Sequence, residues 1–581
     1  MKLKNIMTCL WGATMLMGTP SCTDLDETVY DQLMTSNYYQ TKEDVIRAFV
    51  RPFEHAYWSI TSTYRLQEIT ADQIGTWERD GWFYDGGIWD RLHKHTWGLE
   101  GTDAGYITNA WNGFFQGIGQ CNVVLEDFEK LDPQQFGYTA EEFAALEAQL
   151  HTLRAWFYIR ALDMFRYLPK AVSFNDQSQN TTTQLSPEET FAFIESELVE
   201  ALKSLPVKDG QSGNGLQQGQ WNKASAAALL VRLYLNAEKW TGTPKYTECA
   251  EYAQHILDGD YGNYSLAKNW YEPFDWNNET CNEILFGFTA SFSRTHWHMD
   301  SSMYWWGAPN DAHRYFEFTE WGGMLPSYAV QPSLDVDGNP YNFELGMPVE
   351  RFKKYPADHR LKKYRNLEGT SKREGMFLYG YLTYNNENDT VKSPTTPYNL
   401  YLRDQVGRFY GTKPGTAIDD KESNVLHGDM NSGWCAVKYP VYRDDDPGMM
   451  EADFAGIRLA EVYYSLAECK LRSGDTAGAA RLLNEVRRRN YPEEHWNEYL
   501  YQPDGNATLT EAELLDEWGR EFFNEGRRRT DLCRWNKYSS ATWWDKQPEA
   551  DNHTDIFILT KEILGANPDL KQNPGYPDIT R

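Results

Sequence analysis

The sequence predicts a mainly α-helical protein of paired helices, with a loop-rich lobe of short strands inserted before the last pair. Residues 41–258 and 452–535 repeat apolar side chains at spacings of three and four, as amphipathic helices do. Residues 259–451 instead contain short apolar runs, such as EILFGFTAS, between clusters of Gly, Pro, Asn and Asp. We therefore expect four helix pairs, three before the lobe and one after it.

The chain begins with the features of a lipoprotein signal peptide. Two lysines among the first four residues precede an apolar run at 6–17, which is too short to cross a bilayer as a lasting helix. Small or turn-forming residues then lead into Cys22. We interpret 1–21 as the signal peptide, Cys22 as the lipid-anchored residue and 22–40 as an anchor with an acidic leader. The alternative is ordinary signal cleavage without a lipid.

Composition and charge limit the partners. The 581 residues include 84 acidic and 56 basic side chains, a formal net charge of -28, which argues against nucleic acid and anionic membrane surfaces. After the leader, the best apolar run starts at Ala226 and contains Arg232, so it is too short and too polar to span a membrane. We expect the lipid at Cys22 to be the membrane attachment.

The cysteines give no framework of cross-links. Of the 8 cysteines, Cys9 lies in the leader and Cys22 takes the lipid, and the others are scattered singly without a CxxC pair. This favours buried thiols over a disulfide framework or a zinc site. One disulfide in an oxidising compartment remains an open alternative.

The candidate helix pairs lie at 42–128, 140–204, 221–258 and 454–490. In the last of them, small residues at helical spacing let two helices approach closely, and a glycine permits the tight turn between them. These residues are Ala460, Ala467, Ala479, Ala480 and Gly474. The pattern resembles a tetratricopeptide repeat, whose period is about 34 residues. An unrelated helical bundle is the alternative.

The rest of the C-terminal half completes the predicted order of segments. One further helix follows the fourth pair within 452–535, and 536–581 is expected to be an extended C-terminal segment. Residues 259–451 form the loop-rich lobe and carry an aromatic cluster. Loops held on a rigid scaffold are where binding residues tend to lie, so the lobe is the natural place for a site.

Several motifs that suggest chemistry have simpler structural explanations. Charged residues near the fourth pair fall at spacings of three, four and seven, so ion pairs on a helical face explain them. They are Arg520, Glu521, Glu525, Arg528, Asp531 and Arg534. The histidines at 93–95 and 296–298 lack the companion ligands that zinc requires, and LDVDGNP at 334–340 fits an Asp-Gly turn better than a calcium loop. We expect no catalytic residues, no cofactor and no metal.

Five stretches together resemble the RagB/SusD family of outer-membrane lipoproteins of Bacteroidetes. They are the Cys22 leader, LHTLRAWFYIRALDMFRYLP at 150–169, IRLAEVYYSLAECKLRSGD at 457–475, DEWGREFFNEGRRRTDLCRW at 516–535 and LKQNPGY at 570–576. They span nearly the whole length in the expected order. Trp518 stands where the family usually shows arginine, which weakens any inference about the ion pairs of that helix.

The resemblance implies a fold, a place and a partner. The fold is a SusD-like scaffold of four tetratricopeptide-like helix pairs with a smaller irregular lobe that carries a sugar site. The place is the outer membrane, facing the cell exterior, and the acids after Cys22 resemble the export tag of surface lipoproteins. The implied partner is a TonB-dependent, SusC-like transporter seated on the helical face.

Two aromatic clusters, at 76–97 and 295–321, are the candidate sugar site. Pyranose rings present apolar faces and polar edges, so a site needs flat rings beside Asp, Asn or Arg. We expect the clusters to meet, although each tryptophan could instead belong to the core. The candidate glycan-binding residues are Trp77, Trp82, Trp89, Trp297, Tyr304, Trp305, Trp306, Arg65 and Asp72.

The sequence thus predicts a non-catalytic, lipid-anchored surface protein that captures oligosaccharide or polysaccharide and delivers it to the transporter. A surface glycoside hydrolase or lyase is one alternative, and it would require a pair of carboxylates across the aromatic cleft. A scaffold that binds peptides or proteins is the second alternative. The sugar, its linkage and its length are not encoded in any pattern that we find.

Overall fold

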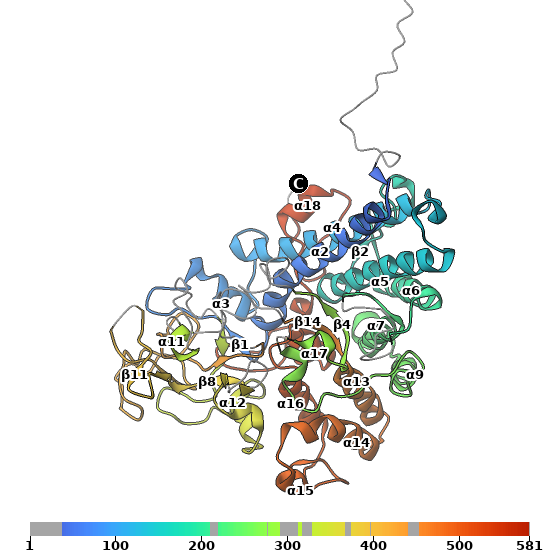
Figure 1. Cartoon of the computed structure of the whole chain (residues 1–581). Helices are drawn as coiled ribbons and strands as arrows, with labels where there is room; N and C mark the ends of the chain where they lie inside the picture. Colours follow the sequence, from blue (N-terminus) through green and yellow to red (C-terminus); the bar gives the residue numbers. More distant parts are fainter. Residues whose placement is uncertain are drawn as a thin grey trace, which may run out of the picture.

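A computed structural model describes residues 38–208, 219–275, 277–290, 309, 312–316, 328–366, 373–394, 397–439 and 452–579. In this part of the chain, four helix pairs and an irregular lobe form the fold that the sequence predicts. Figure 1 shows the helices on the right and at the bottom, and the lobe with α12 and β8 on the left. Cys22 and its leader lie outside the described residues, so the lipid anchor stays a prediction.

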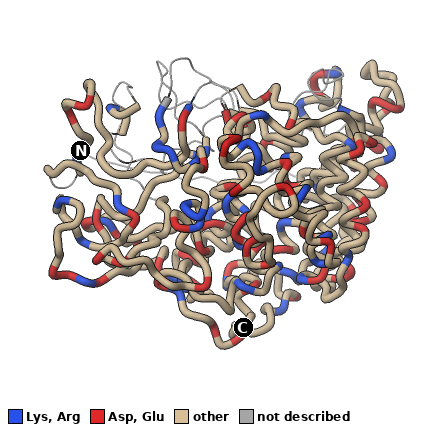
Figure 2. The backbone as a smooth tube through the Cα atoms, turned by 90° about the horizontal axis from the view of Figure 1, so that it is seen from below, with Lys and Arg blue, Asp and Glu red and all other residues tan. Residues whose placement is uncertain are grey.

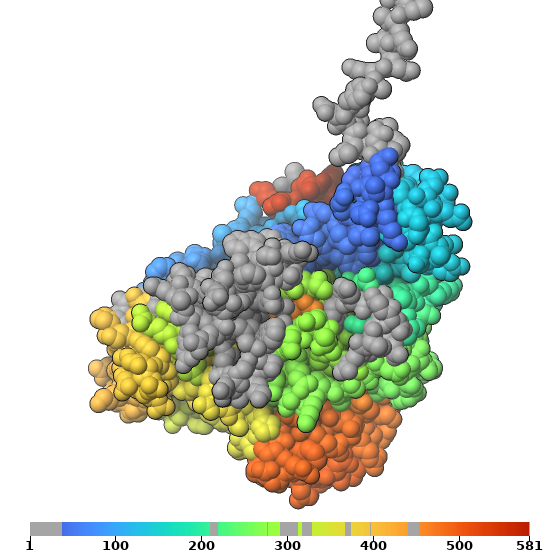
Figure 3. Space-filling view, in the orientation of Figure 1, coloured from blue at the N-terminus to red at the C-terminus, as the bar shows by residue number. Residues whose placement is uncertain are grey.

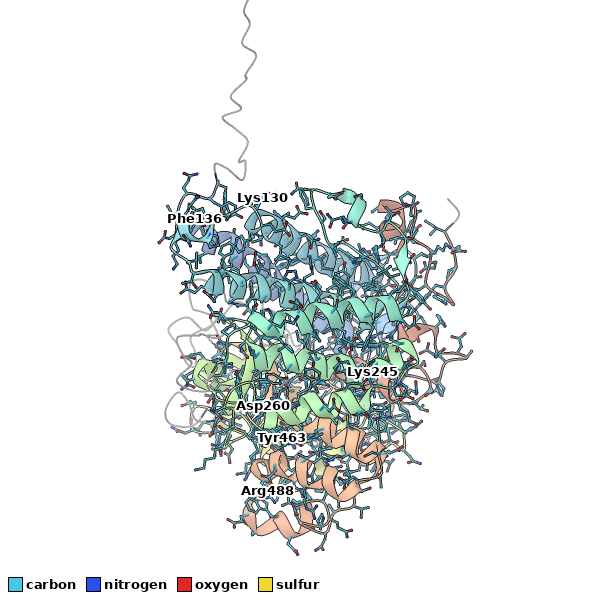
Figure 4. The ribbon with its side chains drawn as sticks, turned by 90° about the vertical axis from the view of Figure 1, so that its right-hand side faces the viewer. Lys130, Phe136, Lys245, Asp260, Tyr463 and Arg488 are labelled. Carbon is cyan, nitrogen blue, oxygen red and sulfur yellow. The ribbon has the colours of Figure 1, made fainter. Side chains whose placement is uncertain are left out.

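The long helices form one continuous array. They are α2 (Lys42–Glu68), α4 (Thr102–Phe128), α5 (Ala140–Phe165), α6 (Pro187–Ser204), α7 (Lys223–Leu235), α9 (Tyr246–Leu257), α13 (Leu459–Arg472) and α14 (Thr476–Arg487). Each packs against the next in this order. Figure 4 shows them one above another, from the end of α4 near Lys130 down to Arg488. The array places the chain before the lobe, in α9, directly against the chain after it, in α13.

Local capping signals decide where these helices begin. Four helices begin at residues that accept a hydrogen bond from the backbone N–H three residues later, and the side chain at that later position accepts one from the backbone N–H of the cap. These cap residues are Thr41, Thr139, Ser186 and Asn222. Such caps each contribute about 1 kcal/mol to helix stability. The sequence therefore fixes the starts of four helices without help from tertiary contacts.

The fourth pair packs as the small residues predict. Ala467 and Ala480 are completely buried, and Gly474 takes φ +89° in the turn between α13 and α14. The pair begins at Leu459, however, and not at 454 as predicted. Residues Phe454–Arg458 form strand β14 instead, because they pair with β4 (Ile284–Phe288) in an antiparallel ladder.

Short strand pairs hold the irregular parts together. They are β1 (Ile74–Gly75) with β5 (Ala329–Val330), β2 (Leu168–Pro169) with β3 (Gln184–Leu185), β6 (Arg365–Asn366) with β7 (Arg373–Glu374), β8 (Phe377–Leu378) with β13 (Cys435–Ala436), β9 (Gly380–Tyr381) with β12 (Tyr401–Leu402), and β10 (Thr383–Tyr384) with β11 (Asp389–Thr390). The lobe has a small apolar core of its own around Tyr364, Leu378 and Leu402. The pairing of β1 with β5 joins the segment after α2 to the lobe.

The remaining helices are short. They are α3 (Ile88–His93), α8 (Ala237–Thr241), α11 (Ala312–Phe316), α12 (Pro348–Lys353), α15 (Trp496–Tyr499), α16 (Glu511–Glu521), α17 (Arg528–Arg534) and α18 (Lys561–Ala566). The last of these lies in the C-terminal segment that was expected to be extended. In the described part of the chain, no helix combines the length and the apolar character that crossing a membrane requires.

Buried ion pairs tie α16 and α17 to the rest of the molecule. Glu521 contacts Arg458 at 3.0 Å and Arg489 at 2.7 Å, and Arg534 contacts Glu468 at 2.9 Å. The predicted structural role of the charged series is confirmed, but most partners lie on other elements and not on the same helical face. Figure 2 shows acidic and basic residues interleaved through the body of the molecule.

Trp518 and the cysteines are parts of the core. Trp518 is completely buried against Tyr464 and Phe522, and the Arg527 guanidinium lies 4.5 Å from its ring centroid. All six cysteines of the described chain are free thiols; five are buried, and Cys281 is half-buried. The preference for buried thiols over a disulfide framework is therefore confirmed for these residues.

Candidate functional site

A tight turn after β1 presents Trp82 to solvent. Backbone hydrogen bonds of 2.9 Å run both ways between Arg79 and Trp82, and the central residues Asp80 and Gly81 take φ +51° and +92°. This is a two-residue hairpin turn with both central residues left-handed, a geometry that Asp-Gly favours. The Trp82 side chain at its edge is 52% exposed.

The residues that follow adopt strained backbone conformations. Phe83 and Asp85 are non-glycine residues with φ +61° and +45°. Tyr84 lies between them and is 55% exposed. Such conformations each cost about 1 to 3 kcal/mol and persist where the surrounding structure over-determines them, often at binding sites. The loop 79–87 therefore holds two exposed aromatic rings in a fixed local frame.

A second loop, from the lobe, adds a third exposed ring. Tyr410 takes φ +42° and is 53% exposed. Its backbone N–H and that of Phe409 donate to Asp429 Oδ2 at 2.7 and 2.6 Å. Burial, with a smaller contribution from the charge of Asp80, raises the pKa of Asp429 to about 6. The buried carboxylate thus shapes the loop that carries Tyr410.

The two loops lie side by side. Arg79 donates to the backbone carbonyls of Asp429 at 3.2 Å and Ser432 at 2.6 Å, and Glu78 contacts Arg408 at 3.7 Å. Burial and the charge of Asp80 raise the pKa of Tyr410, although the charge of Arg408 opposes this. We call Trp82, Tyr84 and Tyr410 the exposed aromatic surface.

In space, this surface lies where the segment after α2 meets the lobe. Figure 1 shows α3, just beyond the first loop, directly above α11 and β8 of the lobe. Figure 3 shows the yellow lobe and the blue segment on the same side of the molecule, away from the helices coloured green and cyan. Rings with Asp80 and Arg408 beside them offer flat faces and polar edges, which is what a pyranose ring requires.

Two of the predicted stacking residues belong to the core. Trp77 is completely buried, with its ring 5.4 Å from that of Trp544. Trp89 is 4% exposed, and its indole N–H donates to Asp85 at 2.7 Å. Neither ring offers a face to a ligand, so the assignment of Trp77 and Trp89 to a sugar platform is corrected. The physical reason is tertiary packing: the lobe at Gly428 and Gly433 lies against the Trp77 ring, and Tyr106 of α4 packs on Trp89.

The predicted polar partners are also engaged. Asp72 is buried against Arg528, with oxygen–nitrogen distances of 2.7 and 3.0 Å, and although burial opposes ionisation, that guanidinium lowers the pKa of the carboxyl group. Asp72 is therefore corrected from a hydroxyl partner to a structural ion pair. Arg65 donates to the Tyr328 hydroxyl at 2.7 Å and lies over the Tyr106 ring at 5.0 Å, still partly exposed.

The second predicted aromatic cluster is mostly outside the described residues. This applies to Trp297, Tyr304, Trp305 and Trp306. Its described part, α11, directs Phe316 into the core of the lobe, where the ring lies 5.8 Å from Tyr364. The meeting of the two clusters stays a prediction.

Our reading of the sequence missed Tyr84, Tyr410 and Asp80. An Asp-Gly dipeptide at 80–81 could have indicated that Trp82 stands at a turn. No signal in the sequence marks Tyr410, because it becomes relevant only when the lobe folds against the loop after α2.

Of the histidines that could suggest a metal, His93 and His95 are hydrogen-bonded to protein atoms, and those at 296–298 lie outside the described residues. His93 contacts the Trp544 carbonyl at 2.7 Å, and burial lowers its pKa to about 3. His95 contacts Glu549 and the Thr70 carbonyl, both at 2.7 Å. In LDVDGNP, Asp335 accepts backbone hydrogen bonds at 2.9 Å from residues 337 and 339, as a turn requires.

Elsewhere on the lobe, the side chains of Asp420, Glu422 and His427 lie close together, within 4.8 Å of one another. Both acidic side chains are well exposed.

Comparisons with known proteins agree with the fold. The model of the SusD family matches residues 175–576, and a second family model, described as starch-binding associating with outer membrane, matches 57–235. The chain is 25% identical over 499 residues to the starch-binding protein SusD of Bacteroides thetaiotaomicron, covering 79% of this chain and 76% of that protein.

Solved structures show the same architecture. NanU of B. fragilis superposes with a TM-score of 0.66 at 17% identity, covering 94% of this chain and 98% of its own. A laminarin binding SusD-like protein gives 0.62 at 17% identity, covering 93% and 100%. The SusD family model matches residues 175–576, which is more than half of the chain. The chain therefore belongs to the SusD family.

Proposed function

We propose that this protein is a non-catalytic glycan-binding lipoprotein of the outer-membrane surface. In this proposal it captures oligosaccharide or polysaccharide and delivers it to a SusC-like TonB-dependent transporter. Family membership supports the proposal, as do relatives that are named for binding starch and laminarin. The observation in this chain that carries it is the exposed aromatic surface.

The exposure of Trp82 needs a reason, because burial of an aromatic side chain normally stabilises a protein by about 1.5 to 3 kcal/mol. Trp77, five residues earlier, is completely buried, so the fold is able to cover a tryptophan in this segment. A left-handed turn and the hydrogen bonds of Arg79 instead hold Trp82 outward. A fixed, water-facing ring beside acids and an arginine suits stacking on a sugar ring.

The membrane anchor and the partner are further parts of the proposal. Cys22 would carry the lipid, and each buried methylene would add about 0.8 kcal/mol to membrane affinity. Cys22→Ala should then release the protein from membranes. Retention of the variant on membranes, with no acyl mass on Cys22 of the natural protein, would contradict the anchor.

A polysaccharide panel run by affinity gel, with starch and laminarin among its members, tests the proposed function. Calorimetry with the retarded glycan then compares Trp82→Ala with Trp58→Ala. Trp58 is the matched control, because it is 40% exposed on α2 and lies in the helix array. We expect only Trp82→Ala to lose binding.

The same panel separates the alternatives. New reducing ends or unsaturated products from the bound glycan would replace the proposal with a hydrolase or lyase. Binding of peptides with no glycan retarded would replace it with a protein-binding scaffold.

A further inference from the structure

A cavity lies at the centre of the molecule, away from the exposed aromatic surface. It has a volume of about 120 Å³, is partly open, and is lined by α2, α5, α7, α13, the β4–β14 ladder and the segment that joins α16 to α17. Figure 1 shows β4, β14 and α17 at this central position. One water needs only about 10 to 15 Å³ by the same measure, so a small organic molecule has room.

The walls are apolar except for a group of charges. Trp156, Phe288, Phe454 and Phe522 supply much of the apolar surface. Three lining arginines are paired with carboxylates: Arg232 with Glu461 at 2.7 Å, Arg527 with Glu461 at 3.0 Å and Arg458 with Glu525 at 2.9 Å. A third lining acid, Asp163, contacts Arg529 at 3.0 Å, so each acid of the cavity has an arginine partner other than Arg160.

Arg160 is the exception among the lining arginines. In the described part of the chain, no carboxylate forms an ion pair with it. Its Nη1 donates to Ser59 Oγ at 3.2 Å, and its guanidinium lies 4.2 Å from the Trp156 ring centroid and 5.3 Å from that of Phe114. Burial and the nearby charge of Arg232 lower the pKa of Arg160 to about 9, although the charge of Asp163 opposes this, so Arg160 remains protonated at neutral pH.

Arg160, which has no carboxylate partner among the described residues, is suited to binding an anion. A charge that is removed from water is costly unless it is paired. The chain has 84 acidic residues for 56 basic ones, so acidic partners are plentiful in its composition. Arg160 also keeps part of its surface uncovered, because it lines the cavity. The guanidinium fork matches the two oxygens of a carboxylate, which it can bind through two parallel hydrogen bonds.

We propose that this cavity binds a small carboxylate, with Arg160 as its charge partner and the aromatic walls against its apolar part. The ligand is a short organic acid or the carboxylate end of a larger molecule. The proposal goes beyond glycan capture, since the cavity and the exposed aromatic surface share no residue.

Propionate and propionamide test it directly, because they have nearly the same size and differ in charge. Ligand-observed NMR on the purified protein in low-chloride buffer should give propionate a dissociation constant of order 1 mM, as suits so few atoms. Propionamide should bind at least tenfold more weakly. Equal binding of the two compounds, or none, overturns the proposal without any need for a variant.

Variants locate the site. Arg160→Gln should abolish propionate binding, and Arg160→Lys should retain part of it. Arg47→Gln is the control, since Arg47 is an arginine with a 67% exposed side chain on α2. Trp82→Ala should bind propionate normally even where it has lost glycan, which separates failure here from failure of the proposed function. Unchanged propionate binding by Arg160→Gln would show that the anion binds elsewhere.

Discussion

The helix array and the loops around the lobe use the same residue types in opposite ways. In the array and the helices packed on it, arginines such as Arg487 and Arg534 are buried against carboxylates, and Trp518 is completely covered. In the loops, Trp82 and Tyr410 face water. The charged and aromatic residues of the array therefore serve stability, and the exposed rings of the loops serve ligand contact. Mutations should separate stability from binding.

The largest loss of stability should come from breaking the charge network of the array. Glu521→Gln leaves Arg458 and Arg489 buried with less compensation, which should lower the free energy of unfolding by about 3 to 5 kcal/mol. Glu54→Gln is the control, because its side chain is 72% exposed and a surface pair contributes about 1 kcal/mol or less. Denaturant melts measure both. Equal stability of the two variants would contradict the role given to the network.

Two tryptophans five positions apart give the sharpest contrast. Trp82→Ala should weaken glycan binding by about 2 kcal/mol or more and leave stability unchanged. Trp77→Ala should lower stability by about 3 to 5 kcal/mol, because its ring is completely buried. Calorimetry and thermal melts on both variants decide this. A stable Trp77→Ala that binds no glycan would show that the core and surface roles are assigned the wrong way round.

Overpacking the fourth helix pair should have a moderate effect. Ala467→Leu or Ala480→Leu adds methylenes where no space remains and should cost about 1 to 3 kcal/mol. Ala512→Leu on α16 is the matched control, since Ala512 is exposed. The melting temperature should fall only for the first two. No change in any of the three would mean that α13 and α14 do not pack through these alanines.

The smallest effect is a dependence on pH that differs in sign between buried acids without an arginine partner and those paired with one. Burial raises the pKa of Asp404 to about 7 and that of Asp429 to about 6, so the folded lobe binds protons that the unfolded chain releases. Its stability should therefore fall as pH rises from about 4 to 7. Although burial opposes it, pairing with Arg232 lowers the pKa of Glu461 to about 2, and this stabilisation is lost as pH falls below about 4.5.

Thermal melts between pH 4 and 8 measure both signs. The melting temperature should rise on mild acidification from pH 7, by roughly 1 kcal/mol of stability per pH unit, and fall again below about pH 4.5. Asp404→Asn should reduce the first slope and leave the second, since Asp429 keeps its own raised pKa. A melting temperature that rises steadily with pH up to 8 would contradict the raised pKa values of the lobe.

Much of the array was predictable because its signals are local. These signals influence only the neighbouring residues of the chain. Examples are the cap Thr139, the small residues Ala467 and Ala480, and the turn residue Gly474. The strand at 454–458 was missed for the opposite reason. Its partner, β4, lies far away in the sequence, and only that pairing makes it a strand.

The sequence by itself determined the class of fold, the order of the helix pairs and the presence of aromatic clusters, because periodicity, caps and composition act along the chain. Only the tertiary structure decided which aromatic ring is exposed and which charge is paired. Trp77 and Trp82 lie in the same short stretch, and nothing near Asp72 in the sequence marks it as half of an ion pair. Burial and pairing depend on distant segments, such as Arg528 for Asp72, which no local pattern records.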